Sequence, residues 1–177
     1  MNSEPFNWTP NYSLSKYTSL KDSKKQTIIL GADFAGFAIK ERIKIHLSNI
    51  PCYEVIDIGC DNDKPNNYPD FSEKLGLAVI EKEGNLGILF CGSGIGIAIA
   101  CNKIKGIRAA TVHDSTTARL TREHNNANVI AIGGWTTGAA VVYDIVDEFL
   151  EAKFNTEDPS HSERVGIIKK LEEKYFK

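Results

Sequence analysis

The sequence predicts a three-layer α/β/α sandwich built on a parallel β-sheet. From residue 27 onward, short apolar runs alternate with longer segments of helical pattern, which is typical of strands separated by helices. Glycines follow several of the apolar runs, as expected where a strand ends and the chain turns toward the next helix. Such connections are right-handed crossovers, so neighbouring strands are expected to run parallel.

Five strands and six helices account for most of residues 26–177, which we expect to form a single domain. The strands are expected at 27–30, 53–58, 86–90, 108–112 and 129–132. The helices are expected at 37–47, 71–82, 95–104, 115–123, 137–152 and 162–175. Ser115 is the expected N-cap of its helix, and the polar stretch 60–70 is interpreted as a loop. Because the sheet is complete without the last helix, we expect that helix to reach across to another subunit.

Composition limits the classes of function. The chain has 177 residues, of which 42% are hydrophobic and 25% charged, as in a soluble globular protein. A net charge of −2 gives no case for a nucleic-acid or anionic-membrane partner, and no apolar run is long enough to cross a bilayer. The four cysteines fit neither a zinc site nor a CxxC motif. We therefore expect free thiols in a reducing, cytoplasmic compartment.

Residues 1–25 differ from the rest of the chain. They are polar, show no periodicity, and lack both the apolar core of a secretory signal and the arginines of a transit peptide. We interpret them as a partly ordered N-terminal extension.

The segment 86–103 contains the clearest candidate for chemistry. An apolar strand-like run ends at Cys91, a glycine-rich turn follows, and an Ala/Ile-rich helix begins. Ligands of open α/β sheets bind at this edge, and the unpaired N–H groups of a helix start favour an anion or a thiolate. Cys91 is therefore a candidate base or nucleophile, although a cysteine is also commonly a small buried apolar residue.

Other polar side chains follow strands at the same edge of the predicted sheet. Asp33, Ser93 and the pair His113 and Asp114 come after strands, as does the 133–135 turn. Together they could form an acid–base site. Alternatively, Asp33 and Asp114 could cap the helices that follow them.

His124 and Asn125 end the helix before the fifth strand, near a sheet end that the sequence does not identify. His124 could equally interact with the C-terminal helix dipole. The Tyr-Pro-Asp sequence at 68–70 could be a rigid turn.

Taken together, these motifs resemble the ribose-5-phosphate isomerase type B family, which includes the galactose-6-phosphate isomerase subunits. Segments 91–96, 99–103 and 106–109 are similar to its core signature, and 122–129 is similar to its second signature. Asp33 with 36–37, and Tyr68 with 69–70, resemble its first turn and its substrate loop. The similarity runs in unbroken order over about residues 28–175.

The resemblance implies a Rossmann-like fold with strand order 2-1-3-4-5 and an aldose–ketose isomerase that works without metal or other cofactor. It implies interconversion of ribose 5-phosphate and ribulose 5-phosphate through a cis-enediolate. Cys91 would move the proton between C1 and C2, His124 would assist ring opening with help from Asp33, and Ser93 would lie near the reacting oxygens. The implied substrate-binding residues are Asp33, Tyr68, Gly92, Gly94, Ile95, Gly96, Asn125, His161 and Arg164. The implied assembly is a homodimer or homotetramer whose active sites are shared between subunits.

Three positions depart from the family pattern. Phe34 stands where a histidine is common, and Trp135 and Ser160 stand where arginines are usual, so that Arg164 and His161 remain for the phosphate. The chain could hold phosphate with these residues, with His113 or with a nearby lysine. It could instead act on a different sugar, with or without phosphate, or be one subunit of a mixed oligomer whose partner supplies the arginines.

Functions of other classes remain open from the residues alone. A dinucleotide-binding domain is disfavoured because 92–96 reads GxGxG rather than GxGxxG, and because the motif does not follow the first strand. A Cys–His hydrolase would need a third group to orient His124, and Asn125 is its direct neighbour. A non-catalytic assembly subunit would show no turnover without a partner chain.

Overall fold

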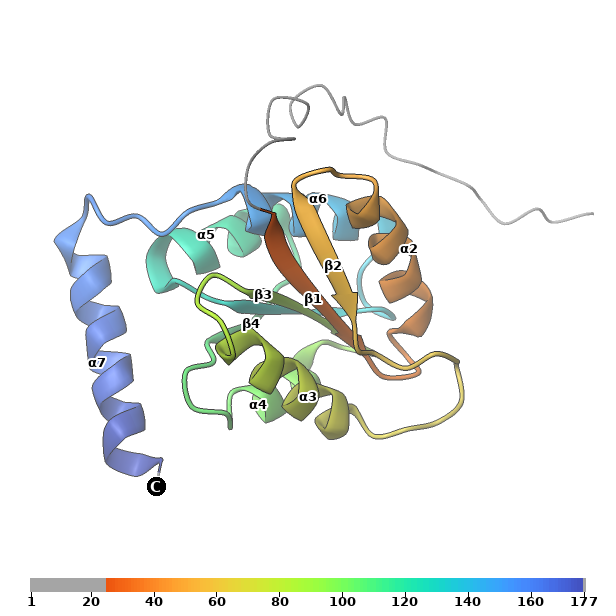
Figure 1. Ribbon diagram of the computed structural model, residues 1–177, viewed down its shortest axis with the longest axis horizontal. Helices are drawn as coiled ribbons and strands as arrows, with labels where there is room; N and C mark the ends of the chain where they lie inside the picture. The colour runs from red at the N-terminus through yellow and green to blue at the C-terminus, as the bar shows by residue number, and fades with distance from the viewer. Residues whose placement is uncertain (1–24, 177) are drawn as a thin grey trace, which may run out of the picture.

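The computed structural model describes residues 25–176, and they form a five-stranded parallel sheet with helices on both faces (Figure 1). The strands are β1 (Gln26–Ala32), β2 (Tyr53–Asp57), β3 (Leu86–Cys91), β4 (Ala109–Thr111) and β5 (Val129–Gly133). The helices are α2 (Phe37–Ser48), α3 (Tyr68–Ile80), α4 (Ile95–Cys101), α5 (Ser115–Asn125), α6 (Ala139–Glu151) and α7 (Pro159–Tyr175). The predicted sandwich is confirmed. The predicted N-terminal extension lies outside the described residues.

The strand order is β2-β1-β3-β5-β4, so the expected order 2-1-3-4-5 is wrong in its last two strands. All five residues of β5 are buried, whereas β4 has only three residues, each half-buried. A fully apolar strand is most stable between two neighbours, and a short strand is well suited to an edge. β5 therefore pairs with β3, with Gly133 opposite Cys91, and among the described strands β4 pairs with β5 alone.

The two faces of the sheet carry separate apolar cores. In β1, Ile28 and Leu30 face one core and Ile29 faces the other, as the alternation of side chains along a strand requires. The first core is completed by α2, α5 and α6, and the second by α3 and α4. Helix α7 belongs to neither core and stands beside the sandwich (Figure 1).

Local predictions at several helix starts are wrong, since α6 begins at Ala139 rather than at 137 and α7 at Pro159 rather than at 162. Helix α3 begins at Tyr68 rather than at 71. Pro69 is tolerated in its first turn, because the N–H groups of that turn have no partner within the helix and the missing N–H of proline therefore costs no hydrogen bond. The N-cap of α5 is Asp114 rather than Ser115, since the Asp114 carboxylate accepts a hydrogen bond from the Thr117 N–H at 2.8 Å. The expected loop therefore ends before residue 68.

All four cysteines are buried free thiols, as predicted. Within residues 25–176, none of the helices combines the length and apolarity needed to span a membrane.

Candidate functional site

The carboxyl ends of β1, β3 and β5 bring three turns together at one edge of the sheet. The Asp33 N–H donates to the Phe90 carbonyl at 3.2 Å, and the Gly134 N–H donates to the Cys91 carbonyl at 2.7 Å. The Trp135 N–H donates to the Gly92 carbonyl at 3.0 Å. These backbone bonds fix the turns relative to one another. We call this group of turns the carboxyl-edge cluster, comprising 33–36, 91–96 and 133–136.

Cys91 is the last residue of β3 and is 5% exposed. Its Sγ accepts the Gly94 N–H at 3.1 Å. Gly94 makes this contact with φ of +78°, a left-handed conformation that glycine adopts without strain. The Ser93 hydroxyl accepts the Ile95 N–H at 3.3 Å. One backbone donor of the turn thus contacts the sulfur, and the next donor contacts the Ser93 hydroxyl.

Asp33 is buried in the first turn of the cluster, at 5% exposure. Its Oδ1 accepts the N–H groups of Ala35 and Gly36, each at 3.0 Å. Burial raises the pKa of Asp33, and these two hydrogen bonds only partly oppose the shift. The predicted capping role is wrong in detail, because the N-cap of α2 is Gly36 and Asp33 stabilises the turn that precedes it.

Tyr68 and Gly96 meet where α3 approaches the start of α4. A Cβ on Gly96 would lie 2.9 Å from the Tyr68 Cζ, so the phenol ring occupies the space that a side chain would take. Thr111, at the end of β4, donates its hydroxyl to the Gly94 carbonyl at 3.3 Å. Asn66 accepts the Phe34 N–H at 3.0 Å. Neither Thr111 nor Asn66 belongs to a sequence motif, so neither was predicted to support the site.

His124 and Asn125 lie at the opposite edge of the sheet. They end α5, which leads back to the first residue of β5, Val129. Gly133, which pairs with Cys91, lies about 13 Å further along that strand. Arg122 fixes the end of α5 by donating to the Ala127 carbonyl at 2.7 Å.

His161 joins His124 at this amino edge. The two imidazole rings stack with centroids 4.4 Å apart and planes at 29°. His161 is buried, its Nε2 lies 3.8 Å from an Asp158 carboxylate oxygen, and its Nδ1 has no hydrogen-bond partner among the described residues. Arg164 follows on the same helix and is exposed. We call His124, Asn125, His161 and Arg164 the amino-edge group.

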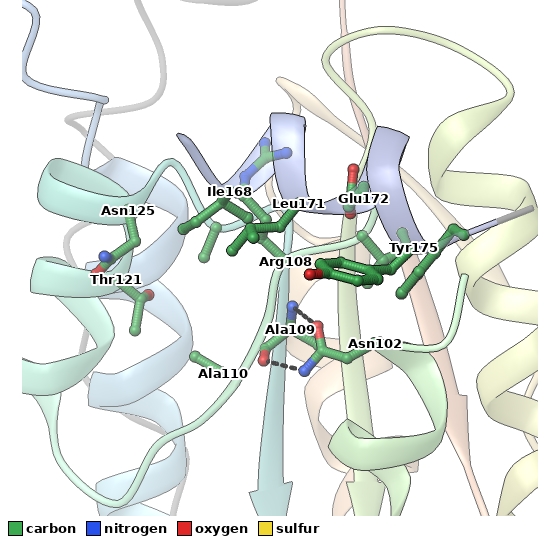
Figure 2. A pocket seen from close by; sticks show the side chains of 13 residues that line it. Asn102, Arg108, Ala109, Ala110, Thr121, Asn125, Ile168, Leu171, Glu172 and Tyr175 are labelled. Atoms are coloured by element: carbon green, nitrogen blue, oxygen red, sulfur yellow. Dashed lines mark hydrogen bonds between the residues drawn. The ribbon is translucent and has the colours of Figure 1, made fainter. Parts of the chain in front are cut away.

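A hollow of about 640 Å³ lies between α7 and the body of the protein. Figure 2 shows Ile168, Leu171 and Tyr175 of α7 on one side and Ala109 and Ala110 on the other. Asn102 closes its floor by exchanging two hydrogen bonds with the Ala109 backbone, at 2.7 and 2.8 Å. The lining is largely apolar and includes Asn125 but none of the carboxyl-edge cluster.

The remaining predicted groups are exposed. His113 and Asp114 follow β4, and Asp114 is committed to capping α5. The hydrogen bonds that Thr117 donates lower the pKa of Asp114. Within residues 25–176 no cluster of three or more His, Cys, Asp or Glu side chains has the arrangement of a metal site.

Comparison with known proteins identifies the family. A model of the Ribose/Galactose Isomerase family matches residues 28–168. The chain is 39% identical over 147 residues to ribose-5-phosphate isomerase B of Escherichia coli, covering 83% of this chain and 97% of that protein. It is 41% identical over 146 residues to the galactose-6-phosphate isomerase subunit LacB of Clostridium acetobutylicum, covering 82% of each.

A solved structure of ribose-5-phosphate isomerase B from Clostridium thermocellum superposes with a TM-score of 0.80 at 43% identity, covering 84% of this chain and 99% of that one. The amino-edge and carboxyl-edge residues all lie within the family match, since it spans residues 28–168. The chain therefore belongs to the Ribose/Galactose Isomerase family and is a sugar phosphate isomerase of the aldose–ketose type.

Proposed function

We propose that the protein interconverts ribose 5-phosphate and ribulose 5-phosphate through a cis-enediolate, with Cys91 as the base. The observation that carries this proposal is the buried Cys91 Sγ, which receives the Gly94 N–H inside a turn of closely spaced backbone donors. Cys91 takes the proton from C2 of the open-chain aldose, and the electron pair moves to form the enediolate. The same thiol returns the proton to C1, and the hydroxyl proton passes from O2 to O1, so the isomerisation balances and no redox partner is needed.

The backbone of residues 92–96 stabilises the negative charge that develops on the substrate oxygens in this scheme. Backbone donors that are fixed before the reaction need no reorganisation as charge appears, which is why such groups lower a barrier. Ser93 lies two residues after Cys91, and its hydroxyl accepts the Ile95 N–H at the start of α4. Asp33 is the neighbouring carboxyl, whose pKa is raised by burial, and in this scheme it binds a substrate hydroxyl.

We further propose that each site is completed by a second copy of the chain, in a homodimer or a dimer of such dimers. His124, His161 and Arg164 are at the far edge of their own sheet from Cys91, about 13 Å away along β5 alone. Exposed apolar side chains accompany both groups: Ile95, Ile99 and Leu77 on α3 and α4, and Ile167, Leu171 and Tyr175 on α7. Contact between these surfaces would bury them and bring one copy's amino-edge group toward the partner's cysteine.

In this assembly His124 assists ring opening, and Asn125 and Tyr68 bind sugar hydroxyls. Arg164 and His161 hold the phosphate. The Nδ1 of His161 is buried and has no hydrogen-bond partner among residues 25–176, which supports an anion or hydroxyl of the substrate as its partner. Four free thiols agree with the proposed location in a reducing cytoplasm.

A second candidate is isomerisation of a different sugar phosphate. The chain is as similar to a galactose-6-phosphate isomerase subunit as to ribose-5-phosphate isomerase B, at 41% and 39% identity. Phe34 and Ser160 are uncharged and stand where the family pattern has a histidine and an arginine, so the phosphate contacts of this chain differ from that pattern.

The test is turnover of ribose 5-phosphate by the purified full chain, by Cys91→Ala and by Cys101→Ala. Cys101 is the matched control, because it is a buried cysteine in the next helix and burial raises its pKa to about 12. We expect Cys91→Ala to lose roughly a thousandfold or more in kcat while keeping its folded circular dichroism spectrum, and Cys101→Ala to stay near wild type in kcat. Near-normal turnover by Cys91→Ala would remove the cysteine from the mechanism. Activity on galactose 6-phosphate but not on the pentose phosphate would favour the second candidate.

A further inference from the structure

Trp135 is the most exposed large apolar side chain among the described residues, at 73%. Its backbone is nevertheless fixed, because the Trp135 N–H donates to the Gly92 carbonyl at 3.0 Å and the Gly134 N–H donates to the Cys91 carbonyl at 2.7 Å. An indole that is held on a fixed backbone and stays largely in solvent leaves apolar surface that folding does not bury. Such surfaces mark places where something else binds.

The indole lies directly against the cysteine turn. A Cβ built on Gly92 would lie 2.5 Å from Cε3 of Trp135 and 2.7 Å from Cζ3, so one edge of the indole covers the Gly92 backbone. Gly92 is the residue after Cys91. The indole therefore lies beside the turn that carries Cys91.

Phe34 supports the indole from the neighbouring turn. The two ring centroids are 6.3 Å apart and their planes meet at 70°, an edge-to-face arrangement. Phe34 is held in turn by the hydrogen bond from its N–H to Asn66 and follows the buried Asp33. Two aromatic rings from different turns thus form one wall beside the two predicted chemical groups.

The chemistry of this wall fits the carbon skeleton of a sugar and not its phosphate. An aromatic face is electron-rich and attracts the weakly positive C–H groups that line one side of a sugar, whereas it offers no charge to an anion. The wall is uncharged and next to the turn where the reacting carbons would lie.

We propose that Trp135, supported by Phe34, binds the C–H face of the sugar at the entrance to the Cys91 turn and contributes affinity that does not depend on phosphate. This inference rests on the proposed isomerase site, since it assigns the wall to the same substrate. It makes Trp135 a substrate-binding residue and gives it no part in proton transfer.

The first experiment measures binding without turnover. The full chain carries Trp8→Phe, which leaves Trp135 as the single tryptophan, together with Cys91→Ala to prevent reaction. The probes are ribose 5-phosphate, free ribose and inorganic phosphate. We expect both sugars to change the Trp135 fluorescence in a saturable way and phosphate alone to leave it unchanged. A response to phosphate but not to ribose, or no response to either sugar, would overturn the proposal.

The second experiment compares Trp135→Ala and Trp135→Phe with Ile45→Ala, an exposed aliphatic residue on α2 that is 64% exposed. We expect Trp135→Ala to raise KM roughly tenfold for phosphorylated and free sugar alike, with little change in kcat. Trp135→Phe should recover much of the loss, and Ile45→Ala should match wild type. A change in sedimentation with unchanged KM would assign Trp135 to a subunit contact and overturn the proposal.

The two proposals fail separately. Normal turnover by Cys91→Ala, with the Trp135 fluorescence response present, would contradict the proposed mechanism and leave the aromatic wall supported. Loss of turnover in Cys91→Ala, with no Trp135 response to a sugar that the wild type converts, would contradict the wall and leave the mechanism supported.

Discussion

The two edges of the sheet differ in how they hold their candidate residues. At the carboxyl edge, three turns are joined by backbone hydrogen bonds, and Cys91 and Asp33 are each 5% exposed. At the amino edge, His124 and Arg164 are exposed, and they lie on a helix end and on a helix outside both cores. The carboxyl edge is organised within one chain, whereas the amino edge presents groups outward. We therefore assign the chemical step to the first and the completion of a partner's site to the second.

The largest expected effect concerns the rigidity of the carboxyl edge. Gly36→Ala would set a Cβ 2.4 Å from the Phe90 carbonyl carbon and 2.5 Å from its oxygen, and this strand backbone cannot move aside. We expect a loss of about 3 kcal/mol or more in unfolding free energy, measured by urea denaturation.

Gly138→Ala is the matched control, because a Cβ at this position would have nothing within 4 Å and its φ of −64° suits any residue. Gly138 is the N-cap of α6, where alanine is less favourable than glycine, so we expect this variant to lose no more than about 1 kcal/mol. Equal stability of the two variants would show that the three turns are looser than their hydrogen bonds indicate.

A smaller effect concerns the charges behind the same edge. Lys40 is 1% exposed, and its ammonium donates to both oxygens of Asp57 at 2.9 and 2.7 Å and to the Cys60 carbonyl at 2.8 Å. Burial alone would raise the pKa of Asp57, but hydrogen bonds from Lys40 and Lys44 outweigh burial and lower it. Asp57→Asn should therefore cost about 2 kcal/mol at pH 7, because the buried ammonium loses Asp57 and keeps only the Glu41 carboxylate, at 2.7 Å, as an ionic partner.

The pH dependence of this cost has a defined sign. A carboxyl whose pKa is lowered on folding stabilises the protein at any pH above its ordinary pKa of 3.8. This stabilisation is lost as the pH falls through the lower pKa of the folded state. The difference in unfolding free energy between wild type and Asp57→Asn should be constant from pH 7 to 5 and shrink below pH 3.8. A difference that grows in acid would contradict the ion pair.

The smallest predicted effect concerns substrate affinity at the amino edge. Arg164→Ala should raise KM for ribose 5-phosphate roughly tenfold while leaving KM for free ribose unchanged, because a charge-assisted bond is lost only with the phosphate. This is the opposite of the pattern expected for Trp135→Ala. Equal effects on both sugars would assign Arg164 to folding or assembly.

The carboxyl edge could be predicted from the sequence because its features are local. An apolar run, a cysteine and a Gly-Ser-Gly turn are contiguous, and parallel strands end at a common edge. The elements were predicted to within a few residues for the same reason, although β4 is shorter than its apolar pattern indicates.

The strand order and the position of His124 depend on long-range packing. The strand that lies beside β3 is the one that buries more apolar side chains, which is β5 rather than β4. This comparison depends on packing across the whole sheet and cannot be made from the sequence of one strand. Helix α5 connects β4 to β5, so the position of its last turn depends on where β5 lies in the sheet. The position of His124 can therefore be predicted only after the position of β5 is known. The stacking of His124 on His161 joins residues that are far apart in the chain, and it could not be anticipated from either sequence segment.

The most direct test of a site shared between two copies is complementation. Cys91→Ala and His124→Ala are measured alone and then after co-expression in equal amounts, with hybrids verified by two affinity tags. In a hybrid dimer one site has both residues intact and the other has neither, so a random mixture should regain about a quarter of wild-type activity. A mixture no more active than the two variants measured separately, although hybrids have formed, would contradict the shared site.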